Sequence, residues 1–184
     1  LRTPLNVILS VLQLLSYLDK NDKASEEKNK HYMDVIKKSS NSLLNIINDI
    51  IDSSKIESGA YKINKEENID IVYLVEETAL NMKDYVGEKG IELIIDPEIE
   101  ELEICCDPKE IERCIVNLIG NAVKFTPEGG SITIDIEDLD DKVKISVTDT
   151  GCGIDEKFHK AIFDRFSQVE DSEPVKSGSG LGLT

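Results

Sequence analysis

The sequence predicts an α+β protein in which an antiparallel helical hairpin is followed by a mixed domain of helices and strands. Up to Gly59, apolar residues recur at helical spacing, whereas after it the sequence changes to short runs of alternating apolar and polar residues. The chain has 184 residues, 40% of them hydrophobic, which is enough apolar material for one or two small cores. We place the domain boundary between a hairpin domain over 1–61 and a mixed domain over 62–184.

Two amphipathic helices are predicted in the hairpin domain. The first runs to about Leu18, and alternating steps of four and three place its apolar residues on one stripe: Leu1, Leu5, Ile8, Leu12 and Leu15. After a polar turn, the second helix repeats its apolar residues at roughly seven-residue spacing and ends near Gly59. One hairpin is too thin to bury both stripes, so we expect two copies to pair into a four-helix bundle. The alternative is that the hairpin packs on the rest of its own chain.

In the mixed domain, helices are predicted over 72–86 and 108–125, and strands over 91–95, 103–105, 131–137 and 142–148. The helix start at Asp107 is well marked, because aspartate is a good N-cap and Pro108 suits the first helical position. A tight polar connection separates the last two strands, so we expect them to pair antiparallel.

Charge and composition exclude several classes of partner. With 21 basic and 37 acidic residues, the formal charge is −16, so the surface repels nucleic acid and acidic membrane faces. The four cysteines form no C-x-x-C pair and no cluster with His31 or His159, which fits a reducing compartment without a zinc or redox site. No apolar run approaches the roughly 20 residues that cross a bilayer. We therefore expect a cytoplasmic portion, with membrane attachment only through a possible upstream anchor.

Three polar side chains share one face of the predicted helix over 108–125. Asn117, Asn121 and Lys124 follow one another at steps of four and three, while the apolar residues turn elsewhere. Amide oxygens are suitable ligands for Mg²⁺, and a lysine one turn away supplies the positive charge that phosphate oxygens need. Taken alone, such a pattern is more often an ordinary solvated helix face.

Asp149 leaves the end of a predicted strand just before Gly151 and Gly153. The glycines let a ligand approach the backbone closely beside a carboxylate. A carboxylate can accept a hydrogen bond from an amino group such as that of adenine. Standing alone, the segment would be a tight turn with a surface acid.

A second glycine-rich segment follows about 25 residues later and contains Gly178, Gly180 and Gly182. Free backbone amides in such a segment can wrap phosphate groups, although a flexible loop is the simpler alternative. Between the two segments, Phe163 and Phe166 flank Arg165 in a polar stretch. This arrangement is typical of a mobile lid with an apolar latch.

Together, the asparagine helix, Asp-x-Gly-x-Gly, Phe-x-x-Phe and Gly-x-Gly-x-Gly stand in the order and spacing of the N, G1, F and G2 boxes of histidine kinases. The chain from Leu1 to Thr184 resembles a sensor histidine kinase of two-component systems. The resemblance implies a dimerisation and phosphotransfer hairpin followed by an ATP-binding α/β sandwich of the gyrase, chaperone and histidine kinase type.

The same resemblance implies roles for individual residues. Asn121 and Asn117 would hold Mg²⁺, and Lys124 would contact phosphate. Phe125 would pack near adenine, and Asp149 would bind the adenine amino group. The adenine pocket and the lid would be shaped by Gly151, Gly153, Phe163, Arg165, Phe166, Gly178, Gly180 and Gly182.

The opening string Leu-Arg-Thr-Pro-Leu-Asn resembles the H box, in which a phosphate-accepting histidine and then an acid come immediately before it. Both are therefore expected just upstream of Leu1, and the family pattern also continues beyond Thr184. Thr3 stands at the position linked to dephosphorylating a response regulator, where its hydroxyl could orient the attacking water. His31 and His159 lack H-box neighbours and are expected to be ordinary histidines.

The implied function is ATP-dependent phosphorylation of the upstream histidine and transfer of the phosphoryl group to an aspartate in the receiver domain of a response regulator, with phosphatase activity toward the same partner. Two alternatives are a non-catalytic dimerising scaffold and a gyrase-type ATPase. The intact boxes favour a kinase over a scaffold, and the hairpin beginning Leu-Arg-Thr-Pro favours it over an ATPase. The segment 58–65 is the expected hinge between the domains.

Overall fold

The structure is a computed structural model that describes residues 2–17 and 23–163 of the 184. The chain divides into two compact units, Leu1–Tyr61 and Lys62–Thr184. The first unit is a helical hairpin, and the second combines helices with strands, so the predicted fold class is confirmed. Within the described ranges, no helix is both long enough and apolar enough to cross a membrane.

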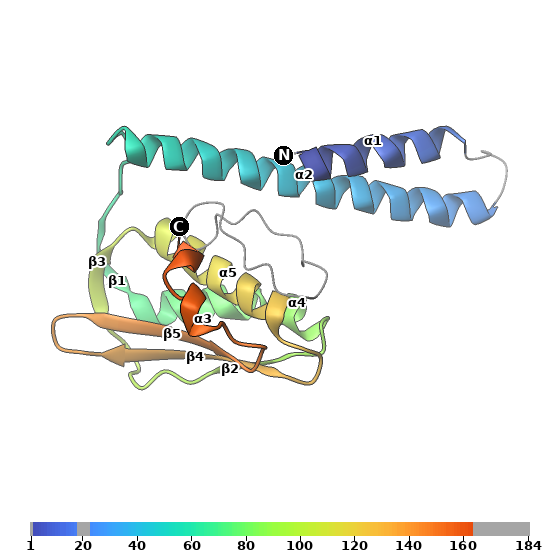
Figure 1. The fold of residues 1–184 in the computed structure, drawn as a ribbon. Coiled ribbons are helices and arrows are strands. Elements are labelled where there is room, and N and C mark those ends of the chain that lie inside the picture. The colour runs from blue at the N-terminus through green and yellow to red at the C-terminus, as the bar shows by residue number, and fades with distance from the viewer. Residues whose placement is uncertain (1, 18–22, 164–184) are drawn as a thin grey trace. The chain divides into compact units, whose positions relative to one another are not determined.

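The first unit consists of helices α1 (Arg2–Ser16) and α2 (Lys23–Glu57), which run antiparallel and in contact (Figure 1). Val11 is buried, and Ile8 and Leu15 of the predicted stripe are half-buried. Leu5 and Leu12, from the same stripe, are 47% and 50% exposed. A single hairpin therefore leaves part of its apolar surface uncovered.

The end of α2 lies near Gly59, as predicted. Gly59 has a φ of 69°, the left-handed conformation that glycine adopts without steric cost. The N–H groups of Ala60 and Tyr61 both donate to the carbonyl of Lys55, at 2.8 and 3.1 Å. These bonds hold the chain to the end of α2 as far as Tyr61.

The second unit contains a three-stranded sheet in the order β2–β4–β5. Strand β2 (Glu92–Ile95) runs parallel to β4 (Ser131–Asp138), which pairs antiparallel with β5 (Val143–Asp149). The β4–β5 ladder extends from Asp138 opposite Val143 to Ile132 opposite Asp149. The predicted antiparallel pairing of the last two strands is thus confirmed.

A second sheet pairs strands β1 (Glu66–Asp70) and β3 (Glu103–Cys106) antiparallel. Helices α3 (Ile71–Asn81) and α5 (Pro108–Phe125) pack against each other, and Figure 1 shows them together over one side of the sheets. The unit is therefore a sandwich of a helical layer and a β layer.

The core lies between these two layers. Alternate residues of β4 point inward, and Ile132, Ile134 and Ile136 have no exposed surface. They belong to one buried cluster with Ile115 and Ile119 of α5. Removal of this apolar surface from water is the main stabilising contribution in the unit.

Two features differ from the sequence prediction. The single helix predicted over 72–86 is two helices, because α3 ends at Asn81 and α4 (Lys83–Gly87) begins after Met82. The break accompanies complete burial of Val86 in the core. Strand β1 was not predicted at all, and a bulge between Glu66 and Ile69 interrupts its pairing.

Replacing Ile119 with alanine should destabilise the second unit by about 2–5 kcal/mol, because truncation of a buried isoleucine leaves a cavity. Val116→Ala on the same helix is the control, since Val116 is 43% exposed. It should change stability by no more than about 0.5 kcal/mol. Urea denaturation followed by circular dichroism measures both variants, and equal losses would contradict the assigned orientation of α5.

Candidate functional site

Helix α5 is anchored by side chains at both of its ends. At the start, the buried Asp107 carboxylate accepts hydrogen bonds from the N–H groups of Glu110 (3.4 Å) and Asn64 (2.7 Å). The first bond caps the helix, and the second ties the segment before β1 to it. At the other end, the buried Thr126 hydroxyl donates to the carbonyl of Ala122 at 2.7 Å. The helix is therefore a firmly held platform for the side chains it carries.

The predicted polar face of α5 carries Asn117, Asn121 and Lys124, all half-buried. Among the described residues, the amide groups of Asn117 and Asn121 have no hydrogen-bond partner. The Lys124 Nζ atom lies 4.8 Å from the centroid of the Phe125 ring, a cation–π contact. This face thus offers amide oxygens and a lysine ammonium to a ligand.

The loop after β5 begins with Asp149, the last residue of the strand. Its Oδ1 atom accepts a hydrogen bond from the Gly151 N–H at 2.8 Å, which turns the chain out of the ladder. Its Oδ2 atom has no hydrogen bond to any described residue. One carboxylate oxygen is therefore fixed by the backbone while the other is available.

Gly151 brings this loop against the end of α5. A Cβ atom at this position would lie 2.7 Å from the carbonyl oxygen of Phe125 and 2.5 Å from Asp149 Oδ1. Such distances leave no room for a side chain. The structure therefore places Asp149, Gly151 and Phe125 together, at the end of the helix that carries the polar face.

The other predicted site residues form no hydrogen bond with Asp149, Gly151 or Phe125 within the described part of the chain, or they lie outside it. Gly153 has a φ of 68° and nothing near its missing Cβ. Phe163, at the end of the short helix η2 (Ala161–Phe163), is 60% exposed. Thr3 is exposed on α1, in the other unit. Those outside the described residues are Arg165, Phe166, Gly178, Gly180 and Gly182.

Residues that the sequence analysis did not single out lie where the loop after β5 meets the start of β4 and the end of α5. The Thr150 hydroxyl accepts a hydrogen bond from the Ser131 N–H at 2.9 Å. A Cβ atom at Gly130 would lie 2.5 Å from Thr126 Cγ2 and 2.7 Å from Thr150 Oγ1. The sequence signal that could have identified this contact is Gly130, directly before β4, because glycine in or beside a strand often marks a place where another segment approaches closely.

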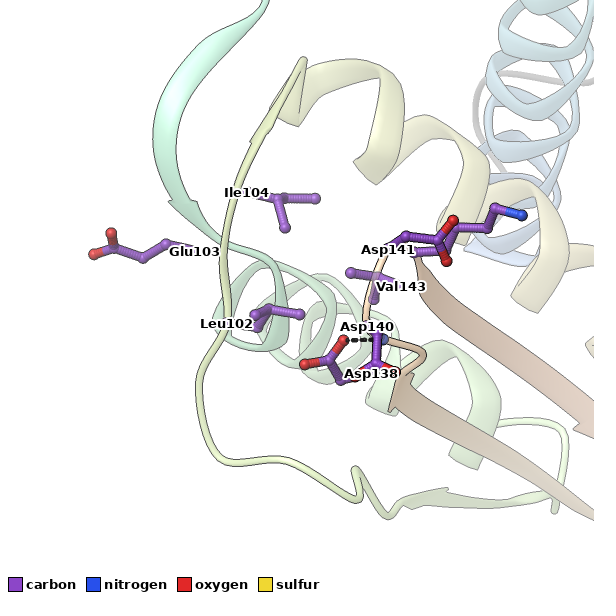
Figure 2. Close-up of a pocket in the computed structure, with 8 residues that line it drawn as sticks. Leu102, Glu103, Ile104, Asp138, Asp140, Asp141 and Val143 are labelled. Atoms are coloured by element: carbon purple, nitrogen blue, oxygen red, sulfur yellow. Dashed lines mark hydrogen bonds between the residues drawn. The ribbon is translucent and has the colours of Figure 1, made fainter.

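A cavity of about 410 Å³ lies in another part of the second unit (Figure 2). It is lined by β3 and the preceding Leu102 and by the β4–β5 connection, and its acidic lining residues are Glu103, Asp138, Asp140 and Asp141. Because β4 runs from Ser131, beside Thr150, to Asp138, the cavity and the Asp149 loop lie at opposite ends of the β4–β5 hairpin. The predicted site residues do not line it.

Ionisable groups with shifted pKa values lie outside the predicted site. A hydrogen bond to Glu137 raises the pKa of Lys144, and hydrogen bonds from Lys157 lower the pKa of Asp155. Burial raises the pKa of the Cys106 thiol. Among the described residues, no group of three or more histidine, cysteine, aspartate or glutamate side chains could hold a metal ion.

Two protein families match successive parts of the sequence. Residues 1–59 match the His Kinase A (phospho-acceptor) domain. Residues 106–184 match the histidine kinase-, DNA gyrase B- and HSP90-like ATPase family. The matches cover the hairpin and most of the second unit.

Relatives from Dictyostelium discoideum and Vibrio cholerae align with the whole chain. Hybrid signal transduction histidine kinase L of Dictyostelium discoideum is 37% identical, and the chain covers 11% of it. The autoinducer 2 sensor kinase/phosphatase LuxQ of Vibrio cholerae is 36% identical, with 21% of it covered. The chain therefore spans about a tenth to a fifth of these relatives.

A solved structure also matches almost the whole fold. Full-length ShkA in complex with AMPPNP has a TM-score of 0.72 at 29% identity, covering 99% of this chain and 36% of that one. The fold is thus an ATPase sandwich of the histidine kinase, gyrase B and HSP90 class, preceded by a phospho-acceptor hairpin. The chain belongs to the sensor histidine kinases, and the resemblance of its sequence boxes is confirmed.

An alanine at position 151 should push the Asp149 loop away from α5, since its Cβ would lie 2.7 Å from the Phe125 carbonyl. Overpacking of this kind costs about 1–3 kcal/mol, so we expect nucleotide affinity to fall about tenfold. Gly120→Ala on α5 is the control, because its Cβ meets nothing within 4 Å. Calorimetric titration with AMPPNP measures both, and unchanged affinity in Gly151→Ala would contradict the close packing.

Proposed function

We propose that this chain is the catalytic core of an ATP-dependent histidine kinase in a two-component system. The second unit binds Mg-ATP, and the γ-phosphoryl group passes to a histidine just upstream of Leu1 and then to an aspartate of a response regulator. The observation that carries the proposal is the meeting of Asp149, Gly151 and Phe125 at the end of α5. A carboxylate with one oxygen free of hydrogen bonds to the described residues, close to a helix end that carries a phenylalanine, suits a purine base.

The adenine base is recognised by Asp149 and by residues close to it. Asp149 Oδ2 accepts a hydrogen bond from the exocyclic amino group, while Oδ1 stays bonded to the Gly151 N–H. The Phe125 ring is 45% exposed and offers an apolar surface to the purine. Gly151 and Gly153 carry no side chain that would block the approach of the base.

The phosphates are held by the polar face of α5. The Lys124 ammonium, which lies over the Phe125 ring, contacts phosphate oxygens. The free amide oxygens of Asn117 and Asn121 fit Mg²⁺, a cation that takes oxygen ligands from protein and substrate together. When bound, Mg²⁺ neutralises charge that develops on the phosphate oxygens.

Catalysis in this site is mainly positioning, because phosphoryl transfer asks little covalent chemistry of the protein. A neutral imidazole nitrogen attacks the γ-phosphorus in line with the leaving ADP oxygen, and the acid after the histidine orients the ring. The resemblance to the family assigns Phe163, Arg165 and Phe166 to a lid over the nucleotide and assigns Gly178, Gly180 and Gly182 to its phosphate side. Of these, Phe163 alone lies among the described residues.

The hairpin supplies dimerisation and contact with the response regulator. Leu5 and Leu12 of α1 are exposed, as are Ile47 and Ile50 of α2 at 39% each, so a second copy of the hairpin can cover them in a four-helix bundle. The exposed Thr3 hydroxyl orients the water that dephosphorylates the regulator. LuxQ, which aligns over the whole chain, is a sensor kinase/phosphatase.

The charge of the chain limits its other partners. At −16, it does not attract nucleic acid or acidic lipid surfaces. Its proposed protein partners are a second copy of the chain and the receiver domain of a response regulator. We place this portion of the protein on the cytoplasmic side.

Asp149→Asn should weaken ATP binding by about ten- to a hundredfold, since a hydrogen bond to a charged group contributes about 1.5–3 kcal/mol. Asp138→Asn is the matched control, because Asp138 lies at the far end of the β4–β5 hairpin and should leave the affinity unchanged. The experiment uses the natural protein that contains this chain. Calorimetry with Mg-ATP gives the affinities, and acid-labile phosphate identifies phosphohistidine.

The same experiment separates the alternatives. Absence of Mg-ATP binding in the parent protein would favour the dimerising scaffold. Steady release of phosphate without phosphohistidine would favour a gyrase-type ATPase. Binding that is lost in Asp149→Asn, together with phosphohistidine in the parent, is the result expected of a kinase.

A further inference from the structure

The loop that carries Asp149 is joined to the start of β4 by three hydrogen bonds between Thr150 and Ser131. The Thr150 N–H donates to the Ser131 carbonyl at 3.1 Å, and the Ser131 N–H donates to Thr150 Oγ1 at 2.9 Å. The Thr150 hydroxyl also donates to the Ser131 carbonyl, at 3.4 Å. These bonds continue the β4–β5 ladder, whose last regular partners are Ile132 and Asp149, and they hold the residue directly after the carboxylate.

In the bond from the Ser131 N–H, the Thr150 hydroxyl takes the place of the backbone carbonyl that would accept in a regular ladder. The chain leaves the ladder immediately afterwards, where the Gly151 N–H turns back to Asp149 Oδ1. A strand that turned away without the Thr150 hydroxyl would leave the Ser131 N–H without this partner. The hydroxyl thus allows the ladder and the turn to meet without a break at Asp149.

The Thr150 hydroxyl lies close to Gly130, and Thr150 itself is exposed. Gly130 has no Cβ, and an added one would lie 2.7 Å from Thr150 Oγ1 and 2.5 Å from Thr126 Cγ2. Thr126 is 4% exposed and is itself bonded to the Ala122 carbonyl. The Thr150 hydroxyl can therefore approach the start of β4 because Gly130 has no side chain.

We infer that Thr150 is a positioning residue that directs the free oxygen of Asp149 toward the 6-amino group of a bound purine nucleotide. Thr150 itself does not touch the nucleotide. Its three hydrogen bonds to Ser131 fix the backbone on one side of the carboxylate, and the Gly151 N–H fixes Oδ1 on the other. This inference rests on the proposed binding of ATP and concerns how that site distinguishes purines.

The test compares two nucleotides on the natural protein that contains this chain. Purine riboside triphosphate lacks the 6-amino group, so its affinity does not depend on where the Asp149 carboxylate points. Thr150→Val removes the hydroxyl and should weaken ATP binding roughly fivefold while leaving purine riboside triphosphate within about twofold of the parent protein. Thr150→Ser keeps the hydroxyl and should restore ATP affinity.

Equal losses for both nucleotides, or unchanged affinity for ATP, would overturn the inference. Thr150→Ala is a second variant, which tests the same bond should the valine side chain prevent folding, and hydrogen exchange of the Ser131 amide reports whether the bond is lost. Failure of the parent protein to bind ATP, or to prefer it over purine riboside triphosphate, would instead contradict the proposed function. The two failures are therefore distinguishable.

Discussion

Burial of isoleucine side chains between β4 and α5 is the constraint on which the second unit depends. Ile132 and Ile134 of the strand and Ile119 of the helix have no exposed surface and belong to one cluster. Because α5 must present Ile119 to the sheet, its rotation about its own axis is fixed. Asn121, two residues further on, is turned about 200° from that side and remains half-buried. Apolar packing, rather than any polar contact, thus sets the direction of the polar face.

The close approach of α5 and the loop after β5 depends on two glycines, because glycine has no Cβ atom. At Gly130 and Gly151, a Cβ would come within 2.7 Å of neighbouring atoms, on Thr150 and Phe125 respectively. Each glycine lets backbone from one element approach the other without displacement. The carboxylate of Asp149 therefore lies beside the helix end that carries Lys124 and Phe125, although these residues are far apart in sequence.

The elements that could be predicted from the sequence are those whose end signals and apolar pattern indicate the same secondary structure that tertiary packing requires. Helix α5 has a capping aspartate, a proline at its first position and a regular apolar face, so both its bounds and its polar face were predictable. Strand β1 was not, because in its sequence Glu-Glu-Asn-Ile-Asp only Ile69 is apolar, and its pairing depends on β3, which lies far along the chain. The role of Thr150 likewise depends on a strand partner that no local pattern identifies.

The hydrogen bonds on either side of the domain boundary have a mechanical consequence. Tyr61 is bonded to the last turn of α2 through the Lys55 carbonyl, and Asn64 is bonded to the Asp107 carboxylate. Lys62 and Ile63 alone lie between those two anchor points, and a stretch of two residues spans about 7 Å when fully extended. The connection between the two anchored segments is therefore a short tether with only a few backbone torsions of its own.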